Sequence, residues 1–137
     1  MLFFRLTRKT KNRGLLEGNR AVGMQGEKAA ARFLRRKGYV IMGRNVRTFV
    51  GEIDIVAKRN SFIIFIEVKT RKTESLGPPY LSVTEKKKRK LIQCAQCYLK
   101  AKNIQDMPWS IDVVSVMLDE SGRRVKKIEH FEDAIGE

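Results

Sequence analysis

Two apolar segments separated by two polar residues constrain the fold of this chain more than any other feature. Residues 52–59 and 62–70 are rich in Ile, Val and Phe, and only the dipeptide Asn60-Ser61 lies between them. Segments of this length and composition around a two-residue polar turn are typical of a β-hairpin. The spacing therefore predicts two antiparallel strands in which Arg59 lies opposite Phe62.

The register of this hairpin places acidic residues opposite each other. Facing positions in an antiparallel pair have a constant sum, so Asp54 is predicted to face Glu67, and Glu52 to face Lys69. Two carboxylates directly across a sheet have Cβ atoms about 5 Å apart and repel each other. A bound divalent cation would offset the repulsion, because Mg²⁺ takes hard oxygen ligands. The alternative is a pair of solvated strand ends, with Glu52 and Lys69 as a cross-strand ion pair.

Helical and strand patterns flank the hairpin. Residues 20–37 predict a helix with Ala30 and Leu34 on one face and Gly38 as its stop. The other predicted elements are a strand over 39–46, a loop over 72–82, a helix capped by Thr84 and running to about residue 102, and strands over 111–118 and 124–128. Residues 1–18 are predicted to form a flexible basic tail, and residues 19–137 a single mixed α/β domain.

Glu27 adds a third acidic residue. It lies on the apolar stripe of the predicted first helix, where an unpaired charge is costly. Two interpretations remain open: Glu27 joins a common metal centre with the hairpin carboxylates, or it extends from the edge of the stripe into water.

The charge balance predicts a polyanionic partner. The chain has 29 Lys and Arg against 15 Asp and Glu, a net charge of +14. Nucleic acid is the first candidate, because each neutralised phosphate releases a counterion. No membrane association is expected, since the sequence lacks a long basic helix with bulky aromatics on its other face. The strongest apolar run, residues 62–66, is too short to span a membrane, and no secretory signal is evident, so we expect a cytoplasmic protein.

Several short motifs occur in order beyond the tail. They are Gly26-Glu27, Arg44-Asn45, Gly51-Glu52-Ile53-Asp54, Glu67-Val68-Lys69-Thr70-Arg71, Val83-Thr84 and Asp112-Val113-Val114. This set resembles the YraN-like family of small bacterial proteins, which are predicted endonucleases within the PD-(D/E)XK, or restriction-endonuclease-like, nuclease superfamily. The sequence departs from the pattern in two places: Ser110-Ile111 stands where relatives tend to have Arg-Phe, and Ile53 replaces the usual proline before the Asp.

The resemblance implies a fold and a site. The fold is a restriction-endonuclease-like αβββαβ core, with a mixed central sheet flanked by helices. The implied ligands for Mg²⁺ or Mn²⁺ are Asp54, Glu67 and the backbone carbonyl of Val68. Lys69 would orient or help to deprotonate the attacking water. Glu27 would be a ligand or a nearby base, and Glu52 would position Lys69.

The resemblance also implies a function. The expected activity is metal-dependent endonucleolytic hydrolysis of phosphodiester bonds in DNA, with branched or damaged DNA as a superfamily analogy. Many nucleases of this fold act as homodimers. The residues predicted to contact nucleic acid are Arg44, Arg71, Lys72, Lys87 and Lys90. The alternative is a non-catalytic nucleic-acid-binding module that retains the nuclease fold.

Overall fold

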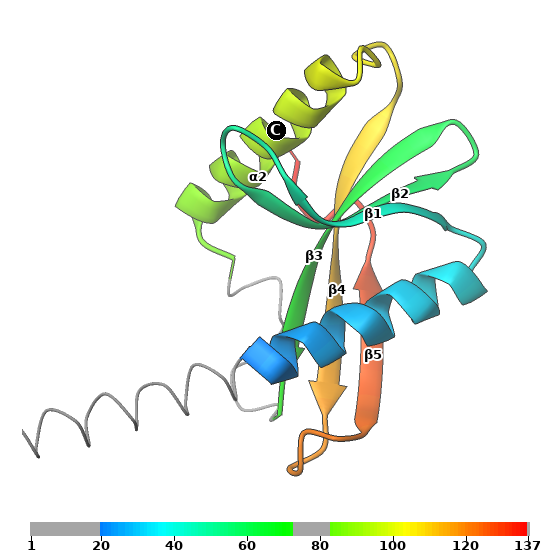
Figure 1. Ribbon diagram of the computed structural model, residues 1–137, viewed down its shortest axis with the longest axis vertical. Helices are drawn as coiled ribbons and strands as arrows, with labels where there is room; N and C mark the ends of the chain where they lie inside the picture. The colour runs from blue at the N-terminus through cyan, green and yellow to red at the C-terminus, as the bar shows by residue number, and fades with distance from the viewer. Residues whose placement is uncertain (1–19, 73–82, 137) are drawn as a thin grey trace, which may run out of the picture.

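A mixed β-sheet with a helix on each face forms the fold in the computed structural model, which describes residues 20–72 and 83–136 (Figure 1). The five strands follow the order β1-β2-β3-β4-β5. Their bounds are Val40–Arg47 (β1), Glu52–Arg59 (β2), Phe62–Arg71 (β3), Trp109–Leu118 (β4) and Val125–Phe131 (β5). A first helix over residues 20–36 precedes β1, and α2 (Glu85–Ala101) lies between β3 and β4.

This arrangement confirms the predicted α/β class, the αβββαβ order and the mixed sheet. All neighbouring strands are antiparallel except β3 and β4. Parallel neighbours need a crossover connection, and α2 lies in that connection. The predicted tail (1–18) and residues 73–82 of the predicted loop lie outside the described residues. None of the described helices has both the length and the apolar character needed to cross a membrane.

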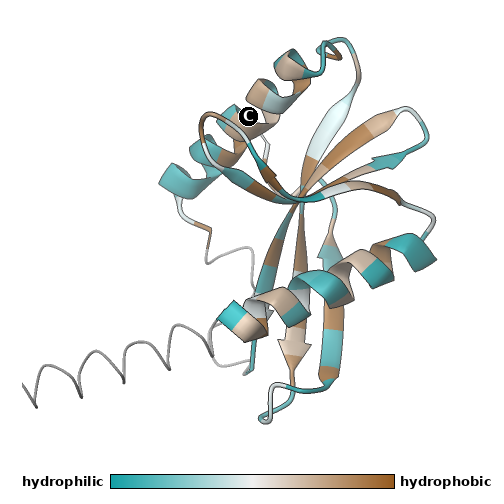
Figure 2. Cartoon of the chain, viewed as in Figure 1, coloured by the Kyte–Doolittle hydropathy of each residue, from teal (hydrophilic) through white to brown (hydrophobic). Residues whose placement is uncertain are grey.

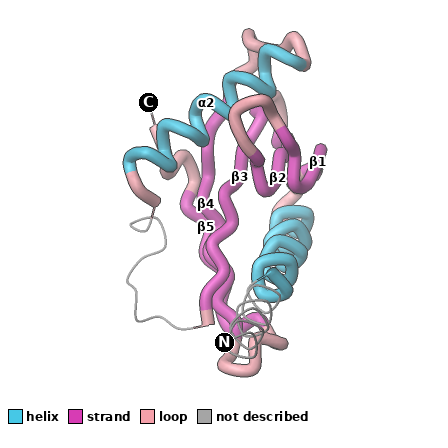
Figure 3. Tube along the Cα trace, turned by 60° about the vertical axis from the view of Figure 1, so that its left-hand side comes forward, coloured by secondary structure: helices cyan, strands magenta, loops and turns pink. Residues whose placement is uncertain are grey.

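The two helices cover opposite faces of the sheet (Figure 3). Successive strand residues point to alternate faces, so each strand contributes to two cores. Phe65 and Val113 pack beneath α2, whereas Ile66 and Val114 pack beneath the first helix. Burial of each such side chain stabilises the fold by about 1.5–3 kcal/mol relative to exposure. The hydrophobic alternation of the strands therefore fixes which residues reach each face.

The hairpin has the predicted register over its paired part. Arg59 faces Phe62, and the pairing continues to Ile55 opposite Ile66. Asn60 has a φ of 54°, the left-handed conformation that tight hairpin turns require. The paired ladder ends at Ile55 and Ile66, one position before the predicted pairing of Asp54 with Glu67.

The first helix approaches the sheet closely at Gly26. A Cβ atom added at Gly26 would lie 1.8 Å from the Oγ1 atom and 2.7 Å from the Cβ atom of Thr70 on β3. Rotation of the Thr70 side chain would not relieve the second contact. Only glycine therefore lets this turn of the helix, which also carries Glu27, lie against the end of β3.

We expect Gly26→Ala to lower the free energy of unfolding by about 1–3 kcal/mol, the usual cost of overpacking. The clash would outweigh the roughly 1 kcal/mol by which alanine is the better helix former. Gly23→Ala is the matched control, because no atom lies within 4 Å of its added Cβ. That variant should gain stability by about 0.5–1 kcal/mol in urea denaturation. Equal effects of the two substitutions would contradict the close approach.

Candidate active site

The half-buried Asp54 on β2 and the buried Glu67 on β3 form a carboxyl pair next to the end of the hairpin ladder. Glu67 is 6% exposed, and a hydrogen bond joins its carboxyl group to that of Asp54. The backbone N–H of Val68 donates to Asp54 Oδ2 at 2.8 Å. The sequence prediction that these two acids come together is therefore met, although side-chain hydrogen bonds rather than a continued strand ladder link them.

The environment of the pair favours a shared proton. Burial, followed by the negative charge of Asp54, raises the pKa of Glu67 to about 7. Burial also raises the pKa of Asp54, while the hydrogen bond from Val68 acts in the opposite direction. The arrangement favours Glu67 as the protonated partner and Asp54 as the ionised one. A group poised near neutral pH in this way is typical of functional sites.

Two lysines lie beside Glu67. Lys69 Nζ lies 3.7 Å and Lys87 Nζ 3.8 Å from Glu67 Oε1. Lys69 follows two residues after Glu67 on the same face of β3. Lys87 comes from the first turn of α2, where its backbone N–H donates to the capping hydroxyl of Thr84 at 3.1 Å. The predicted Thr84 cap is thus confirmed, and it places Lys87 at the carboxyl pair.

Glu27 lies close enough to act on this pair through its charge. Burial, and then the charge of Asp54, raises the pKa of Glu27, while a hydrogen bond from Asn45 lowers it. Within residues 20–72 and 83–136, no three His, Cys, Asp or Glu side chains form a group that could hold a metal ion. The role of Glu27 as a ligand or nearby base therefore stays a prediction.

The predicted contact between Glu52 and Lys69 was wrong. Glu52 faces Arg47 on β1, and its Oε2 atom lies 3.9 Å from Arg47 Nε. Lys69 instead lies next to Glu67. The physical reason is that the β2–β3 ladder ends before Glu52, so this residue pairs with the strand on its other side.

The predicted nucleic-acid contacts occupy different surroundings. Lys90 on α2 lies over the start of β2, since a Cβ on Gly51 would be 3.0 Å from Lys90 Cε. Arg44 is exposed on β1, while the exposed Lys72 extends to the turn at Gly122 between β4 and β5. Figure 2 shows the hydrophilic first turns of α2 that carry the basic run.

Arg71 is the half-buried member of the predicted nucleic-acid contacts. Its Nε and Nη1 atoms are buried and have no hydrogen-bond partner among residues 20–72 and 83–136. Buried donors without acceptors cost about 1–3 kcal/mol each. An anionic oxygen from a bound phosphate would satisfy these donors once the side chain moves to expose them.

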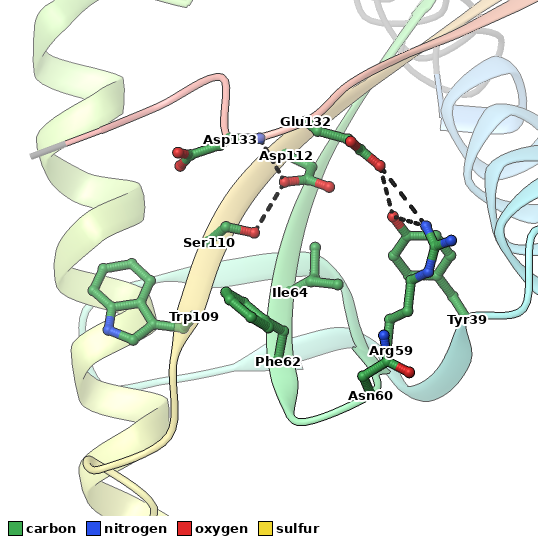
Figure 4. A pocket seen from close by; sticks show the side chains of 10 residues that line it. All are labelled: Tyr39, Arg59, Asn60, Phe62, Ile64, Trp109, Ser110, Asp112, Glu132 and Asp133. Atoms are coloured by element: carbon green, nitrogen blue, oxygen red, sulfur yellow. Dashed lines mark hydrogen bonds and ion pairs between the residues drawn. The ribbon is translucent and has the colours of Figure 1, made fainter.

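A second polar cluster borders a pocket of about 300 Å³ (Figure 4). Asp112 is 2% exposed and accepts hydrogen bonds from Ser110 Oγ at 3.1 Å and from the backbone N–H of Asp133 at 2.9 Å. His130 Nε2 lies 2.7 Å from the other carboxylate oxygen. Because these contacts satisfy Asp112 fully, the cluster ties β4, β5 and the following segment together.

Sequence reasoning did not assign a role to His130. Its partner Asp112 lies 18 residues earlier in the chain, and the two meet only because β4 pairs with β5. No local motif could have indicated this contact.

Comparisons with known proteins agree with the sequence resemblance. The model of a family described as "Uncharacterised protein family UPF0102" matches residues 26–116. A UPF0102 protein of Desulfosudis oleivorans is 48% identical over 102 residues, which cover 74% of this chain and 83% of that protein. A UPF0102 protein of Geotalea uraniireducens is 40% identical over 116 residues, covering 85% and 90%.

One solved structure is similar at a lower level. It is SfsA of Pyrococcus furiosus in complex with Ca²⁺, with a TM-score of 0.38 and 16% sequence identity. The match covers 83% of this chain and 63% of that protein, so the chain spans less than two thirds of its length. A likeness at this level carries no argument about function.

Proposed function

The chain belongs to the uncharacterised protein family UPF0102, and we propose that it is a metal-dependent endonuclease that hydrolyses phosphodiester bonds in DNA. The observation that carries this proposal is the buried Asp54–Glu67 pair with two lysine ammonium groups within 4 Å of Glu67. Two carboxyl groups held together in this way must share a proton or bind a cation, because ionised carboxylates repel each other. The pair thus lowers the stability of the folded state, but it is suited to binding a metal ion.

The donor set fits Mg²⁺ or Mn²⁺. Asp54, Glu67 and the backbone carbonyl of Val68 offer hard oxygen ligands, and Mg²⁺ in proteins takes one or two carboxylates while keeping several waters. A metal ion bound there would lower the pKa of a coordinated water and stabilise charge that develops on the phosphate. Because the pKa of Glu67 is raised to about 7, metal binding at or below neutral pH would require loss of its proton.

Basic residues at the pair and elsewhere on the protein would supply the remaining functions. Lys69, next to Glu67, would orient the attacking water. Lys87, at the same carboxyl group, and Arg71, with its unsatisfied donors, would hold the phosphates on either side of the scissile bond. Arg44, Lys72 and Lys90 would add phosphate contacts without sequence preference.

The superfamily resemblance extends the proposal in two directions. It favours branched or damaged DNA as the substrate, and it is compatible with a homodimer. Both extensions are tested by the substrate panel and by the mass of the protein in solution.

The test is cleavage of single-stranded, duplex, flap and four-way-junction DNA in Mg²⁺ or Mn²⁺, and then in EDTA. We expect cuts that require the metal and that are lost in Asp54→Asn, whereas DNA binding by this variant persists. Binding without cuts across the panel would favour the non-catalytic nucleic-acid-binding module. A protein that neither binds nor cuts any of these DNAs would exclude both functions.

A further inference from the structure

Phe49 has the largest exposed fraction of any large apolar side chain that the structure describes. It is fully accessible to solvent, at 105%, in the loop between β1 and β2. The next most exposed is Val40, at 64%. The folded chain does not bury this phenyl ring, so the ring is free to contact a bound molecule.

The loop holds Phe49 in this position by its own hydrogen bonds. Thr48 Oγ1 accepts from the backbone N–H groups of Val50 at 3.2 Å and Gly51 at 3.1 Å. The Thr48 N–H donates to the Gly51 carbonyl at 2.8 Å. Val50 packs against the core beneath α2, so its neighbour Phe49 points outward from a fixed turn. The exposure is therefore built into the fold.

An apolar groove of about 460 Å³ lies between this loop and the C-terminal half of α2. Its apolar lining includes Val46, Tyr98 and Ala101, and Phe49 also borders it. Two basic residues complete it: Arg47, whose side chain is 90% exposed, and Lys102, whose Nζ lies 5.9 Å from the centre of the Tyr98 ring. An apolar slot with an aromatic wall and cationic edges fits a flat ring attached to a phosphate.

The groove and the carboxyl pair lie along the same helix. Lys87 reaches Glu67, Cys94 lies next to Gly51, and Cys97 lines the groove. Lys87 and Cys97 are ten positions apart, which corresponds to about 15 Å of helix, the length of about four stacked base pairs. Figures 1 and 3 show the β1–β2 loop beside α2. A nucleic acid bound at the pair can therefore reach the groove within a few nucleotides.

We propose that this groove binds an unpaired nucleobase, with the ring of Phe49 stacked on it. This inference rests on the proposed nuclease function and names its substrate class: DNA with unpaired bases a few nucleotides from the scissile phosphate. Every base offers a face to an aromatic ring, so the contact is independent of sequence. The cationic edge residues and the net charge of +14 select a polyanion over an apolar protein surface.

The test compares Phe49→Ala with the wild-type protein in EDTA, so that binding is measured without cleavage. The probes are labelled single-stranded DNA, a duplex of the same sequence, and a duplex with one bulged 2-aminopurine. Loss of one stacking contact should weaken binding of the single-stranded and bulged probes about tenfold, with duplex binding within twofold. The wild-type protein should quench 2-aminopurine fluorescence, and Phe49→Trp should retain this effect.

Phe62→Ala is the matched control, because Phe62 is 46% exposed and lies on a different pocket. It should bind all three probes like the wild-type protein. Equal binding of every probe by Phe49→Ala, or equal weakening of every probe, would overturn the proposal. So would self-association that Phe49→Ala abolishes in sedimentation without a change in DNA binding. Selective binding by a wild-type protein that cuts no DNA in Mg²⁺ would support the groove while rejecting the nuclease function.

Discussion

Glu67→Gln is expected to lower the rate of DNA cleavage by a factor of about 10²–10³ or more, the usual cost of removing one electrostatic contributor to a transition state. The substitution keeps the shape of the side chain and removes the negative charge that would hold the metal. DNA binding should persist, because Lys69 and Lys87 lose a counterion and become freer to contact phosphate. Single-turnover cleavage and anisotropy binding, on one substrate and at one salt concentration, separate the two effects.

The same substitution should stabilise the metal-free protein above pH 7. Burial and the charge of Asp54 raise the pKa of Glu67 from 4.5 to about 7 on folding. A group with a raised pKa contributes stability that is complete below the unfolded value and is lost as the pH rises through the folded value. This difference corresponds to a loss on the order of 3 kcal/mol by pH 8. Glutamine does not ionise, so the variant avoids that loss.

Urea denaturation in EDTA at pH 5 and pH 8 measures the effect. The variant and the wild-type protein should have similar free energies of unfolding at pH 5 and diverge at pH 8, with the variant more stable. Glu120→Gln, at an exposed position in the turn after β4, is the control and should show no such divergence. A Glu67→Gln protein that is less stable than wild type at pH 8 would contradict the assignment of the proton to Glu67.

The combination of lost activity and gained stability would identify a site maintained for function. Two buried carboxyl groups with a shared proton weaken the fold, and apolar residues of similar size would pack there at lower cost. Such local conflicts with folding stability concentrate where a chain binds ligands or performs chemistry. The unsatisfied donors of Arg71 are a second conflict in the same strand, one residue beyond Thr70.

Local patterns in the sequence predicted most of the fold. The strand period and the Asn60-Ser61 turn determine the hairpin register, since Arg59 faces Phe62 as expected. The Thr84 cap depends on residues within one helical turn. These features depend on neighbours in the chain, so composition and spacing are sufficient to find them.

The contacts that sequence reasoning missed join distant segments. Lys87 reaches Glu67 because α2 crosses over the sheet between two parallel strands, and no pattern in either segment encodes that approach. Glu52 pairs with Arg47 and not with Lys69 because β2 has a neighbouring strand on each side, and the hairpin register predicts contacts with only one of them. No sequence pattern pointed to Phe49, since the alternation of side chains along the strands ends where the loop begins. Tertiary packing decides each of these cases.

Metal affinity is expected to depend steeply on pH below 7 and weakly above it. A divalent ion needs Glu67 ionised, and the pKa of this group is about 7 in the metal-free protein. Mg²⁺ or Mn²⁺ binding should therefore strengthen about tenfold per pH unit up to pH 7 and then level off. Calorimetry in two buffers with different ionisation enthalpies should show about one proton released per metal at pH 6, and almost none at pH 8.

Thermal denaturation provides an independent measure of the same coupling. Saturating metal should raise Tm more at pH 8 than at pH 6, because bound ligand stabilises the folded state according to its affinity. The metal-induced rise in Tm at pH 8 should also be larger than the decrease in Tm of the metal-free protein between pH 6 and pH 8. The reason is that the cation neutralises the charge that burial penalises. Asp54→Asn should show neither the Tm shift nor the proton release. Equal metal affinity at pH 6 and pH 8 would show that the ion binds elsewhere, and the carboxyl pair would then lose its assigned role.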